Sequence, residues 1–283
     1  MPHHEEQFQT GDGLTLYETR WLPEGEVRAV VVFLHGFTEH AGRYGELAET
    51  LAGRGFAVWA IDLRGHGKSQ GQKVFFRSID EHLDDLDRLL ARVREEFPHH
   101  PLFLMGHSMG AAIVLLSAME RDPQAAGVVA SAPPVRIGSG VFPLLRHLAA
   151  VVGRIFPRLR LVSIGSSMLS RDPEVIDDFR NDPLVYHGRF PVRSGAEVFR
   201  ASMRIRRGMH RLRLPVLILH GTGDMVTSAK ASGELVAAAA STDKTLKTYD
   251  GLYHDLVHEP EKAAVMADVV TWLEARADHS AGC

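Results

Sequence analysis

The fold of this chain is decided by the stretch Leu102-Phe103-Leu104-Met105-Gly106-His107-Ser108-Met109-Gly110-Ala111-Ala112-Ile113-Val114-Leu115-Leu116. Its first four residues predict a buried strand and its last six an apolar helix, with a Gly-x-Ser-x-Gly pattern at the junction. That pattern is typical of a tight strand-to-helix turn, where the glycines leave room for the backbone and Ser108 exposes its hydroxyl. An ordinary turn serine is the alternative, but the flanking strand and helix favour a nucleophile.

Apolar runs rich in β-branched residues recur on both sides of this turn and predict buried parallel strands. Segments with helical spacing of apolar residues alternate with them, for example residues 83–97 and 263–273. We therefore predict an α/β fold, a mostly parallel sheet flanked by helices, with functional groups at the C-terminal strand ends. The looser alternation of Leu14–Trp21 predicts an antiparallel edge hairpin. The predicted parallel strands are Val27–Leu34, Phe56–Ile61, Pro101–Met105, Gly127–Ala130, Pro215–Leu219 and Leu246–Tyr249.

The alternation of strands and helices stops after Ala132-Pro133-Pro134 and resumes at Leu214-Pro215. Between them, apolar pieces such as Val141–Phe156 carry interspersed Arg and Pro residues and no clear strand. We predict a core of residues 1–134 and 213–283, with a helical cap of residues 135–212 inserted over the sheet. A purely structural subdomain is the alternative to a mobile cover, and exposed apolar surface on the insertion would favour the cover.

Charge is distributed unevenly along the chain. Residues 135–212 contain 14 Arg, no Lys and 6 acidic residues, which gives a net charge of +8, whereas the remainder of the chain has a net charge of −11. The overall charge of −3 argues against general nucleic-acid binding. The basic insertion fits either a solvated face with Arg stems packed on apolar surface or attraction to an anionic membrane or headgroup. Peripheral membrane contact through the cap is one expectation.

Signals for export, membrane insertion or cofactor binding are not found in the sequence. The start lacks a basic and apolar leader, and no run approaches the roughly 18 apolar residues of a membrane span, so we expect a cytoplasmic location. The single cysteine, Cys283, excludes an intrachain disulfide and gives no support to a thiolate metal site. The segment 65–69 lacks the spacing of a phosphate loop, and no dinucleotide or zinc-protease motif occurs. We expect neither a cofactor nor a metal.

A neutral serine hydroxyl is a weak nucleophile, so an imidazole must take its proton and a carboxylate must orient that imidazole. In this kind of fold the order is Ser, acid, His, which places the base late in the chain. His254 lies after the last predicted strand and before the last predicted helix, and it is the predicted base. The other late histidines are His258, which stays open as a second candidate, His220 at a strand end and His279 in a polar tail.

Asp224 is the predicted acid, because the turn His220-Gly221-Thr222-Gly223 presents it at the end of a strand. Asp62 also follows a strand, but it precedes the serine, so we expect it to hydrogen-bond within its own loop, residues 62–69. Asp250 and Asp255 flank the histidine too closely to support its far nitrogen easily. The oxyanion that forms on the attacked carbonyl needs two donors, and we expect these from the backbone amides of Met109 and Phe37.

Six motifs spread over nearly the whole chain resemble the monoacylglycerol lipase and lysophospholipase-like branch of the α/β-hydrolases. The most specific is His35-Gly36-Phe37-Thr38-Glu39-His40-Ala41-Gly42-Arg43-Tyr44. The others are residues 62–69, 106–110, 181–184, 221–224 and 244–254. The resemblance implies an α/β-hydrolase fold with a cap, and cleavage of lipid carboxylic esters, above all of monoacylglycerol to glycerol and free fatty acid, through an acyl-enzyme on Ser108.

The resemblance also implies where the polar head of the substrate lies. Glu39 and Arg43 are expected near it, although an i,i+4 ion pair on a helix face, worth about 0.3–0.5 kcal/mol, is an equal alternative. Phe179 stands where mammalian members carry a tyrosine that contacts the headgroup, so we assign it to substrate binding. The cysteines around the mammalian site have no counterpart here. Ester cleavage is therefore better supported than glycerol recognition.

Three other functions fit parts of the same pattern. A lysophospholipase or a broad-specificity carboxylesterase or thioesterase would use the same three catalytic residues. A non-catalytic binding protein of this fold would usually lack one of the three, and all three are present. Dehalogenases and epoxide hydrolases of this fold need an aspartate at the nucleophile position, so Ser108 excludes that chemistry.

Overall fold

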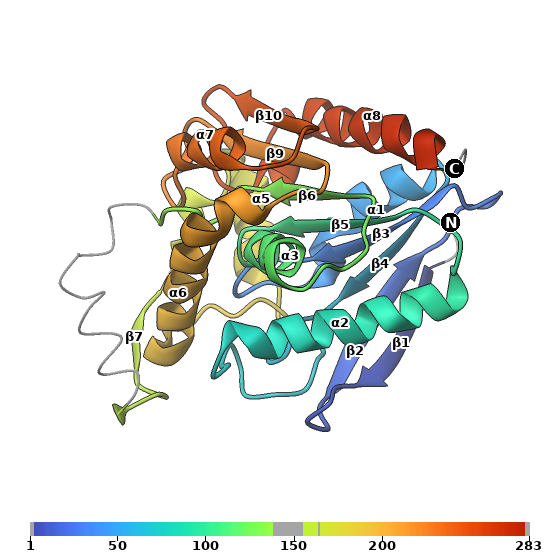
Figure 1. Cartoon of the computed structure of the whole chain (residues 1–283). Coiled ribbons are helices and arrows are strands. Elements are labelled where there is room, and N and C mark those ends of the chain that lie inside the picture. The colour runs from blue at the N-terminus through green and yellow to red at the C-terminus, as the bar shows by residue number, and fades with distance from the viewer. Residues whose placement is uncertain (1–2, 138–154, 164, 281–283) are drawn as a thin grey trace.

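An eight-stranded sheet forms the centre of the computed structural model, which describes residues 3–137, 155–163 and 165–280 (Figure 1). The strand order is β1-β2-β4-β3-β5-β6-β9-β10. Strand β2 runs antiparallel to β1 and β4, and every other neighbouring pair is parallel, which confirms the predicted sheet and edge hairpin. The strands are β1 His3–Gln9, β2 Thr15–Trp21, β3 Ala29–Leu34, β4 Phe56–Ile61, β5 Leu102–His107, β6 Gly127–Ser131, β9 Val216–Gly221 and β10 Lys244–Tyr249.

Helices cover both faces of this sheet and divide the core in two. Along β3, Val30, Val32 and Leu34 pack on one face, and Ala29, Val31 and Phe33 on the other, as the two-residue period of a strand requires. Helices α2, α3 and α7 cover the first face, and α1 and α8 cover the second. The helices are α1 Gly45–Ala52, α2 Ile79–Glu96, α3 Met109–Glu120, α5 Pro173–Asn181, α6 Val192–Gly208, α7 Ala229–Ala238 and α8 Lys262–Ser280.

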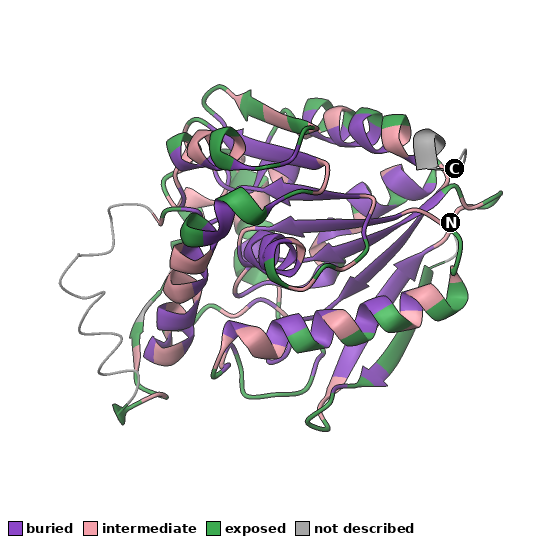
Figure 2. Ribbon diagram, viewed as in Figure 1, coloured by how far each residue is buried: buried purple, intermediate pink, exposed green. Residues whose placement is uncertain are grey.

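Burial of the strands follows from their place in the sheet (Figure 2). The central strands β3, β4, β5, β6 and β9 are buried at every position, which explains their continuous apolar sequences. The prediction that the last strand is buried was wrong. Strand β10 is parallel as expected, but it is an edge strand and none of its residues is fully buried.

The insertion between β6 and β9 is mainly helical in its described part. Helix α5 begins at Pro173, and the Asp172 side chain caps it by accepting a hydrogen bond from the Glu174 amide at 2.9 Å. Helix α6 packs against α3, and its Ala201 and Ile205 are fully buried in the core of the first sheet face. The predicted apolar piece Val141–Phe156 lies outside the described residues except for its last two.

Two short strands in the insertion were not expected from the sequence. β7 (Arg160–Val162) pairs antiparallel with β8 (Phe190–Pro191). A strand of two or three residues is too short to show any periodicity, so the pattern of apolar residues could not reveal it. The remaining short elements are the 3₁₀ helices η1 Ala41–Tyr44, η2 Ser166–Met168, η3 Met209–Arg211 and η4 Leu256–His258.

Candidate active site

Ser108 occupies a strained turn between β5 and α3. Its backbone has φ 50° and ψ −111°, a left-handed conformation that non-glycine residues rarely adopt. The chain reverses so sharply that a Cβ on Gly106 would lie 2.4 Å from the Gly110 carbonyl carbon. A Cβ on Gly110 would lie 2.1 Å from the Leu34 carbonyl oxygen. Only glycine therefore fits on either side, and the turn presents the serine hydroxyl at the carboxyl edge of the sheet.

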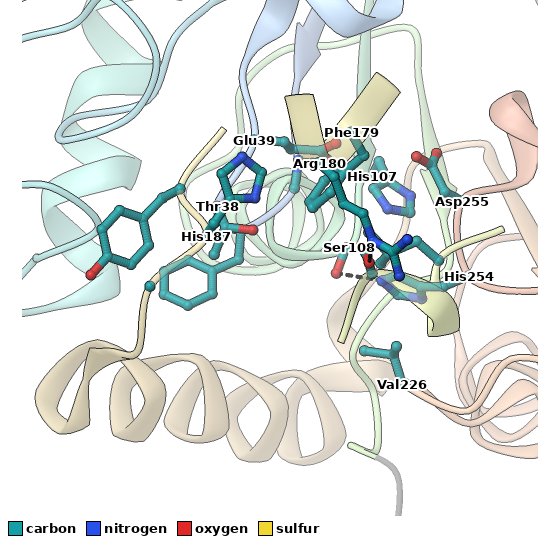
Figure 3. A pocket seen from close by; sticks show the side chains of 16 residues that line it. Thr38, Glu39, His107, Ser108, Phe179, Arg180, His187, Val226, His254 and Asp255 are labelled. Carbon is teal, nitrogen blue, oxygen red and sulfur yellow. Dashed lines mark hydrogen bonds between the residues drawn. The ribbon is translucent and has the colours of Figure 1, made fainter. Parts of the chain in front are cut away.

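The structure brings the three predicted catalytic side chains together. The Nε2 atom of His254 lies 2.9 Å from Ser108 Oγ (Figure 3). Its Nδ1 atom lies 2.8 Å from Asp224 Oδ2. Strands β5 and β9 present the serine and the aspartate at the same edge of the sheet, and the loop after β10 presents the histidine. The sequence separates the serine from the histidine by 146 residues, so only the parallel sheet makes them neighbours.

Asp224 is held as a carboxylate by several donors. The amides of Val226 and Thr227 donate to its Oδ1 at 2.7 and 2.9 Å, and the Thr227 hydroxyl donates to its Oδ2 at 2.7 Å. Burial raises the pKa of Asp224, but the charge of His254 and hydrogen bonds from His220, His254 and Thr227 outweigh it, so the pKa falls far below its usual value. The carboxylate thus keeps its charge for the imidazole.

The electrostatics of His254 match a general base. Burial alone lowers the pKa of this imidazole, and the Asp224 carboxylate, aided by Asp255 and Glu39, raises it by more. The net effect is a pKa above the usual value, so the ring accepts a proton more readily than a free imidazole. The same carboxylate interactions that raise this pKa stabilise the imidazolium that forms when the serine attacks.

The competing histidines and acids are occupied elsewhere. The Nε2 of His258 lies 2.8 Å from the Arg43 carbonyl oxygen, and its Nδ1 lies 2.8 Å from Asp255 Oδ2. The Nε2 of His220 lies 3.1 Å from Asp224 Oδ2, the same oxygen that His254 contacts. The remaining candidate acids also have other partners: Asp62 accepts from the amides of Ala41 and Lys68, as predicted for its loop, and Asp250 accepts from the Thr222 hydroxyl. His279 lies near the end of α8.

The two expected oxyanion donors adjoin the nucleophile. Met109 is the first residue of α3, where the positive end of the helix dipole adds to its amide, and Phe37 lines the same cavity as Ser108. Within the described residues, neither amide donates to another protein group. Both amides therefore remain available for a carbonyl oxygen, and the assignment of these residues to the oxyanion hole stays a prediction.

A cavity of about 330 Å³ opens over the serine, near the lower end of the usual size of ligand pockets. The core contributes Gly36, Phe37, Thr38, Glu39, His107, Ser108, Val226, His254 and Asp255. The insertion contributes Ser166, Leu169, Phe179, Arg180, Tyr186, His187 and Gly188. The site is therefore built jointly by the core and by residues from the predicted cap.

The three predicted substrate-binding residues lie at different depths. Glu39 and Phe179 line the cavity, whereas Arg43 lies outside its lining. Arg43 Nε donates to Glu39 Oε2 at 3.3 Å, and its guanidinium lies 4.8 Å from the centre of the Phe179 ring. The i,i+4 ion pair therefore exists, but Glu39 precedes the helix η1, and both side chains are buried instead of lying on an exposed helix face.

Two contacts fasten the insertion to the loop that carries Phe37. The Tyr186 amide donates to the Thr38 carbonyl oxygen at 2.8 Å, and His40 Nε2 lies 2.8 Å from Asp182 Oδ2. Thr38 itself has φ 74°, which is uncommon outside glycine. The position of the insertion is thus coupled to the loop beside the nucleophile. Both motifs are recognisable in the sequence, but their pairing is not, because 142 residues separate His40 from Asp182.

Arg180 and His187 are cavity residues that sequence analysis missed. Arg180 directly follows Phe179, so its place in the same helical turn was a usable signal. His187 lies in an irregular segment between α5 and β8, and nothing in the sequence distinguished it from a surface histidine. Within the described residues, no group of three or more His, Cys, Asp or Glu side chains could hold a metal ion.

Comparisons with known proteins place the chain in a family. Residues 25–261 match the model of the family described as serine aminopeptidase, S33. The monoacylglycerol lipase of Mycolicibacterium smegmatis is 35% identical over 95% of this chain and 96% of its own length. The monoglyceride lipase of Mus musculus is 38% identical, and the match covers 100% of this chain and 93% of its own length.

A solved structure agrees with these sequence matches. The crystal structure of the Paleococcus ferrophilus monoacylglycerol lipase superposes with a TM-score of 0.85 at 35% identity, and the match covers 92% of this chain and 99% of that one. The fold, the family model and the relatives therefore agree over almost the entire sequence. The chain belongs to the serine aminopeptidase S33 family of α/β-hydrolases, within the branch of the monoacylglycerol lipases.

Proposed function

We propose that this protein hydrolyses monoacylglycerols to glycerol and free fatty acid through an acyl-enzyme on Ser108. The observation that carries the proposal is the alignment of Ser108, His254 and Asp224 at 2.9 and 2.8 Å beside a cavity, in a chain of this family. A serine, an imidazole and a buried carboxylate in this order form the machinery of acyl transfer from an ester.

The first half of the reaction forms the acyl-enzyme. His254 Nε2 takes the proton from Ser108 Oγ as that oxygen attacks the ester carbonyl carbon. The Phe37 and Met109 amides stabilise the oxyanion, and removal of one such donor typically costs about 10²–10³ in turnover. The imidazolium, stabilised by Asp224, then gives its proton to the departing glycerol oxygen as the carbon–oxygen bond breaks.

The second half releases the fatty acid. Water takes the place of glycerol, and His254 removes a proton from it as its oxygen attacks the acyl carbon. The tetrahedral intermediate uses the same two amides. His254 returns the proton to Ser108 Oγ, so the free enzyme is restored and a fatty acid leaves.

Glu39 and Phe179 are proposed to contact the glycerol headgroup. Glu39 Oε1 accepts from the Gly36 amide and from the Tyr44 hydroxyl, both at 2.7 Å, so the carboxylate is held in one orientation at the cavity wall. Arg43 does not line the cavity, and its guanidinium balances the charge of the Glu39 carboxylate. A buried, fixed acceptor of this kind is suited to a hydroxyl group of the substrate.

The acyl chain gives the test of the proposed function. Each buried methylene contributes about 0.8 kcal/mol, so kcat/KM should rise about fourfold per carbon until the apolar site is filled. We expect this rise in a series of 1-acylglycerols from butanoyl to oleoyl, measured as released glycerol. Equal rates from butanoyl to oleoyl esters, or cleavage of short p-nitrophenyl esters without cleavage of monoacylglycerol, would instead indicate a broad carboxylesterase.

Peripheral membrane contact through the insertion is part of the proposal. Ile155, Phe156, Leu159 and Leu161 are large apolar residues whose exposed fractions are 64%, 62%, 43% and 47%. Exposed apolar residues close together in sequence, in an insertion of net charge +8, are suited to an anionic lipid surface. Within the described residues, no helix is long and apolar enough to cross a membrane. The insertion would thus rest on the bilayer from which the substrate comes.

Vesicle flotation measures this contact. We expect binding to vesicles that contain phosphatidylserine, weaker binding to pure phosphatidylcholine, and a steep loss with added salt because exposed charges are screened. Phe156→Ser should weaken binding to both vesicle types, since it removes exposed apolar area without a change of charge. Salt-independent binding that Phe156→Ser leaves intact would contradict the proposed contact.

A further inference from the structure

One cationic side chain lines the catalytic cavity and is only partly used by the protein. Arg180, at the end of α5, donates from Nε to Ser166 Oγ at 3.0 Å, and its Nη1 lies 3.4 Å from Asp177 Oδ1. The side chains of Arg180 and Asp177 are 56% and 69% exposed, so Arg180 lies at the mouth of the cavity and water screens that ion pair. Within the described residues, the Nη2 group of Arg180 has no hydrogen-bond partner. This guanidinium therefore retains donors for a ligand.

The acidic residues of the cavity do not neutralise Arg180, because each has another cation. Glu39 pairs with Arg43 at 3.3 Å. Asp255 pairs with His258 at 2.8 Å and with Arg43 at 3.6 Å. Arg180 is the only Arg or Lys among the described lining residues. Its positive charge is thus the one that an anionic group entering the cavity would meet.

Arg180 stands on the part of the wall that the insertion builds. Figure 3 shows its side chain extending from α5 toward the catalytic serine and histidine, with Thr38 and His187 on the other side of the cavity. A headgroup joined to the reacting ester by a short glycerol chain would remain inside the same cavity. The planar guanidinium can form paired hydrogen bonds to phosphate oxygens, for which arginine is the preferred residue.

We propose that this site also hydrolyses monoacylglycerols whose glycerol carries a phosphate, and that Arg180 binds that phosphate. The inference rests on the proposed function, because the same ester bond is cleaved. Ser108 Oγ takes the acyl group, His254 protonates the departing oxygen of glycerol phosphate, and water then releases the fatty acid. The +8 balance of the insertion raises the local concentration of anionic amphiphiles near the cavity.

A phosphate headgroup fits this cation better than the carboxylate of the released fatty acid. That carboxylate forms on the carbon attached to Ser108, where the proposed oxyanion amides of Phe37 and Met109 hold its oxygens. The headgroup lies one glycerol unit away, on the side of the departing oxygen. The proposal therefore assigns Arg180, which lines the same cavity, to the leaving group of the reaction.

The test compares two substrates that differ only in the phosphate. 1-Decanoylglycerol and 1-decanoylglycerol 3-phosphate are supplied below their critical micelle concentrations, and kcat/KM is measured for both. Wild-type protein should cleave both. In Arg180→Gln the ratio of kcat/KM, phosphate over neutral substrate, should fall about 10–100-fold, the usual effect of losing a charge-assisted hydrogen bond. Arg180→Lys should restore part of that ratio.

Arg189→Gln is the matched control, because it removes the same charge from an exposed residue of the insertion that does not line the cavity. Its ratio should stay within about threefold of wild type. An equal fall of the kcat/KM ratio in both variants would assign the effect to the overall positive charge of the insertion and overturn the role of Arg180.

Other outcomes separate this inference from the proposed function. Cleavage of the neutral ester alone would overturn the inference and leave the proposed function intact, whereas cleavage of neither ester would overturn both. If Arg180→Gln lowered kcat/KM equally for the two substrates, Arg180 would be a structural residue. If it changed only inhibition by decanoate, the cation would bind the product.

Discussion

Ser108→Ala should lower kcat on monoacylglycerol by about 10⁶, because no other group can form the acyl-enzyme and the loss of a nucleophilic serine typically costs that much. The same variant should lose all labelling by a fluorophosphonate probe, which reacts only with an activated hydroxyl. Measurement of both quantities separates the nucleophile from a residue that merely shapes the site.

Ser166→Ala is the control for the labelling experiment. Ser166 lines the same cavity, but its hydroxyl accepts from Arg180 and makes no hydrogen bond to a histidine within the described residues. The label should therefore persist in Ser166→Ala. Persistence of the label in Ser108→Ala, with an unchanged melting temperature, would place the reactive hydroxyl elsewhere and remove the basis of the mechanism.

Asp224→Asn should lower kcat by about 10⁴ with little change in KM, the effect known for the equivalent carboxylate in serine proteases. An amide carries no charge to stabilise the imidazolium, and it can hold the ring of His254 in the wrong tautomer. Asp250→Asn is the matched control, since that acid lies four residues before the base and bonds only to the Thr222 hydroxyl among the described residues. Its kcat should stay within about threefold of wild type.

The pH profile of Asp224→Asn carries a second signature of the same interaction. His254 works as a base only when neutral, so kcat/KM of the wild type falls as the pH drops through a pKa that lies above the usual value of ~6.5. Without the carboxylate, burial remains as the main influence and lowers the pKa of His254. The acid limb of the residual activity should therefore move to lower pH, and an unmoved limb would show that Asp224 does not act on the base.

Much of the fold and of the site was predictable because it depends on local pattern. The continuous apolar runs identified the central strands, since strands buried on both faces need no polar alternation. The glycines at 106 and 110 identified the nucleophile turn, because the backbone there leaves no room for a Cβ. Asp224 and His254 could be chosen because both follow predicted strands, and parallel strands bring their carboxyl ends together.

The remaining features depend on contacts between distant segments. His258 pairs with Asp255 only three residues before it, but its contact with the distant Arg43 carbonyl could not be predicted from the sequence, so it stayed open as a second base. The burial of the Glu39 and Arg43 pair likewise depends on how η1 packs. The prediction of a buried last strand failed because an edge position is a property of the whole sheet.

The sequence by itself determined which chemistry is available: a serine in a strained turn, an acid and a base at strand ends, and a basic insertion. These follow from backbone sterics and from the periodicity of apolar residues, which act over a few positions. The tertiary structure alone decided which charges remain unpaired. Glu39, Asp255 and Arg180 all line one cavity. Glu39 pairs with Arg43 four residues further along, but Asp255 reaches the same Arg43 from the other end of the chain, and only packing of the insertion brings Arg180 into the cavity with both acids, because electrostatic pairing depends on distance in space.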